Sequence, residues 1–168
     1  VTLDIFDLLW GQGHRNIGVV LQADLFRTER DEERLSAMGA RIRLVKGAYR
    51  ERAAVAYQRK ADVDAAYARL VKRLLERGNY PAIATHDIAM IEVAKAHAAQ
   101  LGLGRDRFEF QMLYGIRRDL QQQLVAEGYR MRLYIPFGRQ WFPYFMRRLG
   151  ERPANLGFVL RGVAADRG

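Results

Sequence analysis

Short apolar runs alternate along the whole chain with segments of helical period. The apolar runs cover residues 17–23, 41–47, 81–86, 107–113 and 130–136, and the helical patterns cover residues 25–38, 63–77, 88–101, 117–127 and 140–149. Four of the helical patterns are followed directly by a glycine, the residue that most often closes a helix: Gly39, Gly78, Gly102 and Gly128. Five strands in strict alternation with helices predict a parallel sheet covered by helices.

Two architectures fit this alternation, an open doubly wound sheet and part of a β/α barrel. A nucleotide-binding open sheet carries a G-x-G-x-x-G turn after its first strand, whereas here Gly11-Gln12-Gly13 comes before it. Polar residues instead close strand after strand: Gln22, Arg43, Lys46, Thr85, His86, Gln111 and Tyr134. A barrel assembles its site around that rim, while an open sheet concentrates it in one crevice. The sequence therefore predicts a (βα)8 TIM-type barrel.

The length sets a limit on how much of such a barrel is present. A barrel of this kind needs eight strands and about 250 residues, and the chain has 168 residues with five strand patterns. It starts at Val1 and goes almost directly into a helix. We therefore expect the chain to hold roughly the last five βα units of the barrel.

Composition narrows the possible functions. There is no cysteine, and the three histidines, His14, His86 and His97, lack the spacing of metal ligands, so we expect no metal site. No apolar run is long enough to span a bilayer and no basic stretch leads into an apolar one, so we expect a cytoplasmic protein. The net charge of +9 would suit nucleic acid, an anionic membrane surface or acidic ligands. The arginines are dispersed and form no nucleic-acid-binding motif, and we expect no nucleic-acid partner.

The segment Arg43-Leu44-Val45-Lys46-Gly47-Ala48-Tyr49-Arg50-Glu51 carries the strongest signal for a site. Two cations lie three residues apart at a strand end, and the Gly-Ala step lets backbone come close to a ligand. The next strand ends in Ala84-Thr85-His86-Asp87, which brings a hydroxyl and an imidazole to the same rim. Taken alone, the first segment could be a strand with exposed cations at its end. The histidine of the second segment, taken alone, could be an ordinary hydrogen-bonded residue.

Two further segments add candidate residues. In Phe108-Glu109-Phe110-Gln111-Met112-Leu113-Tyr114-Gly115, Gln111 and Leu113 share one side of a strand, as an active site or a buried strand with one satisfied glutamine would both require. After Tyr134-Ile135-Pro136-Phe137-Gly138, the helical pattern carries Tyr144, Arg147 and Arg148. Two guanidinium groups can bind a carboxylate through paired hydrogen bonds, although a solvated helix with Arg147 paired to Glu151 is also compatible.

Taken together in this order and spacing, these four segments resemble the proline dehydrogenase family over essentially the whole chain. The resemblance implies a barrel that binds FAD non-covalently and oxidises L-proline to 1-pyrroline-5-carboxylate by hydride transfer to FAD, with a quinone as electron acceptor. It implies flavin contacts by eight residues: Gln22, Arg43, Val45, Lys46, Gly47, Ala48, Thr85 and His86. Arg43 would act as the catalytic residue beside the reactive flavin nitrogen. The proline carboxylate would bind Arg147 and Arg148, and the proline ring would contact Leu113, Tyr134 and Tyr144.

The family also uses a lysine and an aspartate from earlier strands, and neither has a match here. We therefore expect residues 1–168 to be the C-terminal part of a single flavin-binding barrel domain, inactive without the remaining strands. The basic charge suits peripheral contact with the cytoplasmic face of a membrane, although no segment is an amphipathic anchor. The alternative is a flavin-binding barrel without catalysis, or a basic α/β domain that binds nucleic acid through arginines on one outer face.

Overall fold

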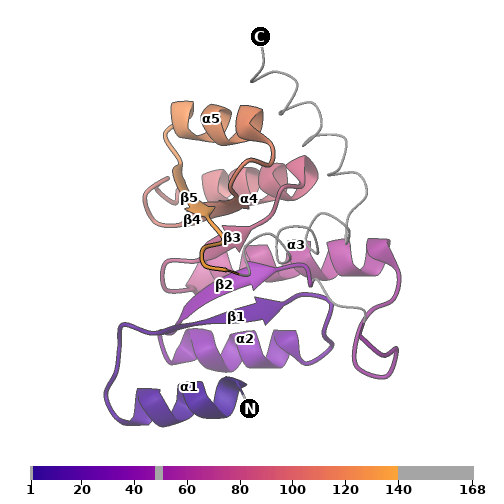
Figure 1. The fold of residues 1–168 in the computed structure, drawn as a ribbon, viewed down its shortest axis with the longest axis vertical. Coiled ribbons are helices and arrows are strands. Elements are labelled where there is room, and N and C mark those ends of the chain that lie inside the picture. The colour runs from indigo at the N-terminus through magenta and orange to yellow at the C-terminus, as the bar shows by residue number, and fades with distance from the viewer. Residues whose placement is uncertain (1, 48–50, 140–168) are drawn as a thin grey trace.

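The computed structural model describes residues 2–47 and 51–139 (Figure 1). Helices and strands alternate along this part of the chain in the order α1 (Thr2–Gly11), β1 (Gly18–Gln22), α2 (Thr28–Ala37), β2 (Arg41–Val45), α3 (Lys60–Arg77), β3 (Ala82–Ala84), α4 (Ile88–Gln100), β4 (Glu109–Leu113), α5 (Arg118–Ala126) and β5 (Arg130–Tyr134). All five predicted strands are present, each slightly shorter than its apolar run. The helix predicted at residues 140–149 lies outside the described residues.

The five strands form one parallel sheet in which every strand pairs with its neighbour in the sequence, in the order β1-β2-β3-β4-β5. A doubly wound sheet reverses direction at a switch point, and this order has none. Right-handed crossovers that always advance in one direction put all the helices on the same side of the sheet. The arrangement is an arc of a (βα)8 barrel, which confirms the predicted fold class.

Glycines end most of the helices as predicted, but not all in the same way. Gly39, Gly102 and Gly128 have φ values of +73°, +63° and +86°, the left-handed conformation that glycine adopts most easily. Gly78 is also the C-cap of its helix, as predicted, but with an ordinary φ of −74°. The turn to β3 is made instead by Tyr80, a non-glycine residue with φ +52°.

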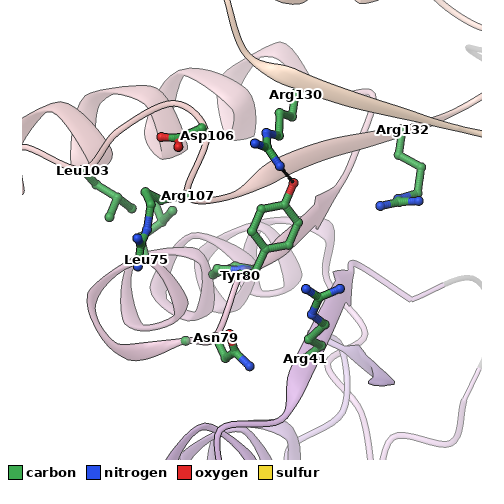
Figure 2. Close-up of a pocket in the computed structure, with 11 residues that line it drawn as sticks. Arg41, Leu75, Asn79, Tyr80, Leu103, Asp106, Arg107, Arg130 and Arg132 are labelled. Carbon is green, nitrogen blue, oxygen red and sulfur yellow. Dashed lines mark hydrogen bonds between the residues drawn. The ribbon is translucent and has the colours of Figure 1, made fainter. Parts of the chain in front are cut away.

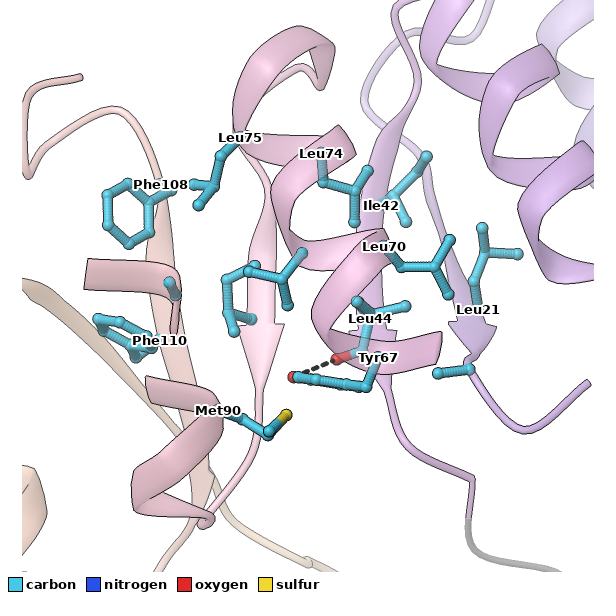
Figure 3. Close-up of a cluster of buried hydrophobic side chains, with 14 of the residues drawn as sticks. Leu21, Ile42, Leu44, Tyr67, Leu70, Leu74, Leu75, Met90, Phe108 and Phe110 are labelled. Carbon is cyan, nitrogen blue, oxygen red and sulfur yellow. Dashed lines mark hydrogen bonds between the residues drawn. The ribbon is translucent and has the colours of Figure 1, made fainter. Parts of the chain in front are cut away.

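The hydrophobic core lies between the sheet and the helices. Alternate strand residues such as Leu21, Ile42 and Leu44 point to this side, where they meet Leu70 and Leu74 of the central helix α3 (Figure 3). Helix α3 packs beside both α2 and α4, so its buried side chains connect both halves of the helix layer. Full burial of one such side chain stabilises the fold by about 1.5–3 kcal/mol.

The opposite face of the sheet is the inner face of the barrel arc. It carries the other alternate residues of each strand, among them Arg43, Gln111 and Tyr134. Parallel strands place all their carboxyl ends at one edge, where Gln22 and Tyr134 end β1 and β5. Arg43 and Gln111 lie two residues before the ends of β2 and β4.

We expect Leu70→Ala to lower the free energy of unfolding by about 2–5 kcal/mol, because Leu70 is fully buried and its neighbours cannot close the cavity. The measurement is urea denaturation followed by circular dichroism. Leu101→Ala is the matched control, since Leu101 is 45% exposed and its truncation should change stability by less than about 0.5 kcal/mol. Equal losses in the two variants would contradict the position of the core.

Candidate active site

Arg43 is the cation that the structure turns toward the inner face near the rim. Its Nε donates a hydrogen bond of 2.7 Å to Oε1 of Gln111, and its Cζ lies 5.6 Å from the centre of the Tyr134 ring. The side chain is half-buried. A strand lies between β2, which carries Arg43, and β4, which carries Gln111, so this contact reaches across β3.

Lys46 points away from Arg43, into the helix layer. Its side chain is 5% exposed, and its Nζ donates to Asp64 of α3 and, at 2.6 Å, to Asp87 just before α4. Burial would raise the pKa of both carboxyl groups, but the hydrogen bonds and charge of Lys46, joined at Asp64 by those of Lys60, outweigh it and lower both pKa values. Two ionised carboxylates therefore surround the ammonium group. The two cations that the sequence placed at one rim thus face opposite sides, although the prediction that Lys46 contacts a flavin stays a prediction.

Asp87 connects Lys46 to the start of α4. Its Oδ1 accepts a 3.0 Å hydrogen bond from the backbone N–H of Ala89, which caps the helix, while its own N–H donates to the Thr85 hydroxyl. The predicted flavin-contacting segment is therefore fixed by the same carboxylate that holds Lys46. Asp87 ends one of the segments that predict the site, but its residue type and spacing indicate no role, and nothing in the sequence points to Asp64.

His86 holds the end of β4 in place. The backbone N–H of Leu113 donates to Nε2 of His86 over 2.9 Å. Because a backbone N–H can only donate, Nε2 must carry the lone pair and the imidazole is neutral, with its proton on Nδ1. His86 is thus placed beside Leu113, one of the residues predicted to contact proline.

Leu113 and Tyr134 are opposite each other at the carboxyl ends of β4 and β5. Leu113 is almost buried, and Tyr134 is 48% exposed, with its ring beside Arg43. The structure thus brings together Arg43, His86, Leu113 and Tyr134. Four predicted residues, Ala48, Tyr144, Arg147 and Arg148, lie outside the described residues.

Gln22 and Val45 complete the described part of the predicted site. They are paired with each other across β1 and β2, and β2 in turn is the neighbour of β3, the strand that ends at Ala84. Both are partly exposed on the inner face, as contacts with a bound group require.

Gly47 occupies a position that only glycine fits. Its φ is +116°, and a Cβ atom there would overlap the carboxylate of Asp24. Asp24 is itself buried, which raises the pKa of its carboxyl group, and among the described residues its Oδ1 has no hydrogen-bond partner. Sequence reasoning expected Gly47 to let backbone approach a ligand. In the structure, a glycine is required at position 47 because the backbone packs closely against Asp24.

We expect Gly47→Ala to destabilise the protein by about 2–5 kcal/mol, because the left-handed backbone strains the new side chain and the Asp24 carboxylate overlaps it. Gly39→Ala is the matched control. Gly39 also has a positive φ, but no atom lies within 4 Å of its Cβ position, so strain alone should cost about 1–2 kcal/mol. Thermal unfolding of both variants gives the comparison, and similar shifts would mean that Asp24 does not restrict Gly47.

Within the described residues no group of acidic or histidine side chains has the arrangement of a metal site. In the same part of the chain, no helix combines the length and apolar character needed to cross a bilayer.

Comparison with known proteins identifies the family. The family model described as "Proline dehydrogenase" matches residues 1–161. The chain is 52% identical over 164 residues to a proline dehydrogenase of Deinococcus radiodurans and 48% identical over 162 residues to proline dehydrogenase 2 of Bacillus subtilis strain 168, covering 97% and 96% of this chain. It spans about half of each relative, 53% in both cases.

The fold is similar to part of a larger solved protein. Proline utilization A of Bdellovibrio bacteriovorus, inactivated by N-propargylglycine, matches with a TM-score of 0.83 and 31% sequence identity. The match covers 99% of this chain and 20% of that protein. The order of the strands, the residues gathered at their carboxyl ends and these matches agree: the chain belongs to the proline dehydrogenase family.

Proposed function

We propose that residues 1–168 are the C-terminal part of a single flavin-binding (βα)8 barrel, and that the complete barrel oxidises L-proline to 1-pyrroline-5-carboxylate with hydride transfer to FAD. The observation that carries this proposal is the position of Arg43, a cation held by Gln111 on the inner face near the carboxyl ends of the strands. Membership of the family and the match to nearly the whole chain support it.

The residues present suit FAD. Bound FAD supplies the acceptor for the two electrons, and its reduced form carries a negative charge near the ring nitrogens. Arg43 is placed to stabilise that charge without moving, because its guanidinium is already hydrogen-bonded. Lys46 has two carboxylate partners, so we assign its contribution to the position of the loop rather than to charge. The other proposed flavin contacts are Gln22, Val45, Gly47, Ala48, Thr85 and His86.

Proline binds, in this proposal, against Leu113, Tyr134 and Tyr144, with its carboxylate held by Arg147 and Arg148. The aromatic and aliphatic side chains enclose the apolar ring, and the two guanidinium groups orient it. The C–H bond that breaks is on the ring carbon next to nitrogen that does not carry the carboxylate. This carbon gives up a hydride, the nitrogen releases one proton, and a C=N bond forms between them. The protein's task is to hold that carbon in position over the flavin.

The electrons then pass, we propose, to a quinone, and the protein is cytoplasmic with peripheral contact at the membrane face. The net charge of +9 supports contact with an anionic lipid surface. A nucleic-acid-binding role has no comparable support. Several described arginines form ion pairs with carboxylates of the same chain, as Arg69 does with Glu29 and Arg77 with Glu32.

The complete barrel should be a yellow protein whose visible flavin absorbance is lost on anaerobic addition of L-proline, with 1-pyrroline-5-carboxylate formed in equal amount. D-proline is the matched control, because it carries the same charges with the opposite configuration at the carboxylate-bearing carbon. A colourless protein that binds heparin with a steep salt dependence would instead support nucleic-acid binding and refute this function.

We expect Arg147→Ala or Arg148→Ala to raise KM for proline about 30- to 100-fold while flavin stays bound, because a charged hydrogen bond worth about 2–3 kcal/mol is lost. Steady-state kinetics and flavin content provide the two measurements. Arg30→Ala, at an exposed position of α2, should leave KM unchanged. An unchanged KM in both the Arg147→Ala and the Arg148→Ala variant would contradict the proposal that these two residues bind the proline carboxylate.

A further inference from the structure

A line of polar side chains crosses the inner face from Arg43 to the opposite end of the sheet. Gln111 accepts from Arg43 through Oε1 and donates through Nε2 to Oε1 of Glu109 over 2.6 Å. Gln111 and Glu109 are both buried. Their side chains share one face of β4 because they are two residues apart.

Two alanines on β3 make this line possible. β3 lies between the strands that carry Arg43 and Gln111, and its register places Ala82 opposite Arg43 and Ala84 opposite Gln111. A methyl group at each position leaves space for the Arg43 side chain to pass over the strand. A large side chain on this face of β3 would block the contact.

The chemistry of its neighbours fixes the orientation of the Gln111 amide. An arginine can only donate and an ionised carboxylate can only accept, so the amide oxygen must face Arg43 and the amide nitrogen must face Glu109. Burial would raise the pKa of Glu109, but hydrogen bonds from Arg132 and Gln111 and the charge of Arg132 outweigh it and lower the pKa. Glu109 is therefore ionised at neutral pH, and the reversed amide would leave both neighbours unsatisfied.

The far end of the line is anchored at the amino ends of the strands. Arg132 binds Glu109 through two hydrogen bonds, 2.6 Å from Nε and 2.9 Å from an Nη atom, and the Tyr80 hydroxyl donates to Glu109 over 3.2 Å. Tyr80 lies between the guanidinium groups of Arg41 and Arg130 beside a cavity of about 500 Å³ (Figure 2). Arg132 and the Tyr80 hydroxyl thus hold the Glu109 carboxylate in place.

We propose that Gln111, locked in one orientation by Glu109, is a positioning residue that sets the direction in which the Arg43 guanidinium faces the flavin. This inference rests on the proposed function, in which Arg43 lies beside the flavin. Gln111 accepts its hydrogen bond from Nε of Arg43. Because the guanidinium is planar, this bond and the contact with the Tyr134 ring together fix the plane of the whole group.

The first test is Gln111→Met in the complete flavoprotein, since methionine matches the shape of glutamine without its amide. The rate constant for flavin reduction by proline should fall about tenfold or more, as expected for a lost hydrogen bond to a charged group. The flavin midpoint potential should become more negative, while flavin content and the Kd for proline stay the same. Gln123→Met is the matched control: Gln123 also donates to a glutamate, Glu127, but on the outer helix α5.

A second measurement reports on Arg43 without using activity. In protein labelled with 15N-arginine, the Arg43 Nε–H should exchange slowly with solvent and should exchange faster in Gln111→Met. Its signal is assigned by its loss in Arg43→Lys. Unchanged exchange, potential and reduction rate in Gln111→Met would overturn the positioning role. A wild-type protein that proline does not reduce would refute the proposed function instead, so the two failures are distinguishable.

Glu109→Met separates positioning from simple electrostatics by the sign of its effect, because methionine removes both the charge of Glu109 and the oxygen that accepts from Gln111. Removing a negative charge near the flavin would by itself make the midpoint potential more positive. If Glu109 acts through Gln111, the amide loses its fixed orientation, Arg43 is released and the potential becomes more negative. In the Gln111→Met background the same change should no longer lower the potential. A more positive potential in the single variant would overturn the role of Glu109.

Discussion

Successive side chains of a β-strand point to opposite faces, and in β2 this alternation separates the core from the candidate active site. Leu44 enters the apolar layer under α3, while its neighbour Arg43 enters the inner face and meets Gln111. Because each strand pairs in parallel with the strand next to it in the sequence, the same division repeats across the sheet. One face therefore supplies stability through burial, and the other is left for polar contacts.

Much of this could be predicted from the sequence, because it depends on local patterns. Short apolar runs located all five strands, segments of helical period located α2, α3, α4 and α5, and the polar residues at strand ends indicated the rim. The turn before β3 could not be predicted, since Tyr80 rather than Gly78 takes the positive φ there and tyrosine carries no signal for it. Helix α3 begins at Lys60, three residues before its apolar pattern, because its first turn is solvated.

Contacts between segments far apart in the chain could not be predicted from the sequence alone. Lys46 appeared to share a site with Arg43, but the structure shows it between Asp64 and Asp87, 18 and 41 residues away. One signal was available: residues 43 and 46 are an odd number apart, so a strand continued through both would put them on opposite faces. The identity of the partners had no such signal. Gln111 was recognised as an inward-facing residue, but its link to Glu109 and Arg132 requires the sheet register.

Lys46 and Arg43 make different contacts, and this difference suits different roles. Lys46 meets two carboxylates, so its charge is compensated within the helix layer and it joins β2 to α3 and α4. Arg43 donates to a neutral amide, and the carboxylate that orients this amide, Glu109, is two residues before Gln111 and is itself paired with Arg132. A carboxylate at position 111 would hold Arg43 more strongly but would compensate its charge, and it would face Glu109 at a distance where like charges repel. A glutamine there fixes the direction of the guanidinium without itself compensating the positive charge that would stabilise a reduced flavin.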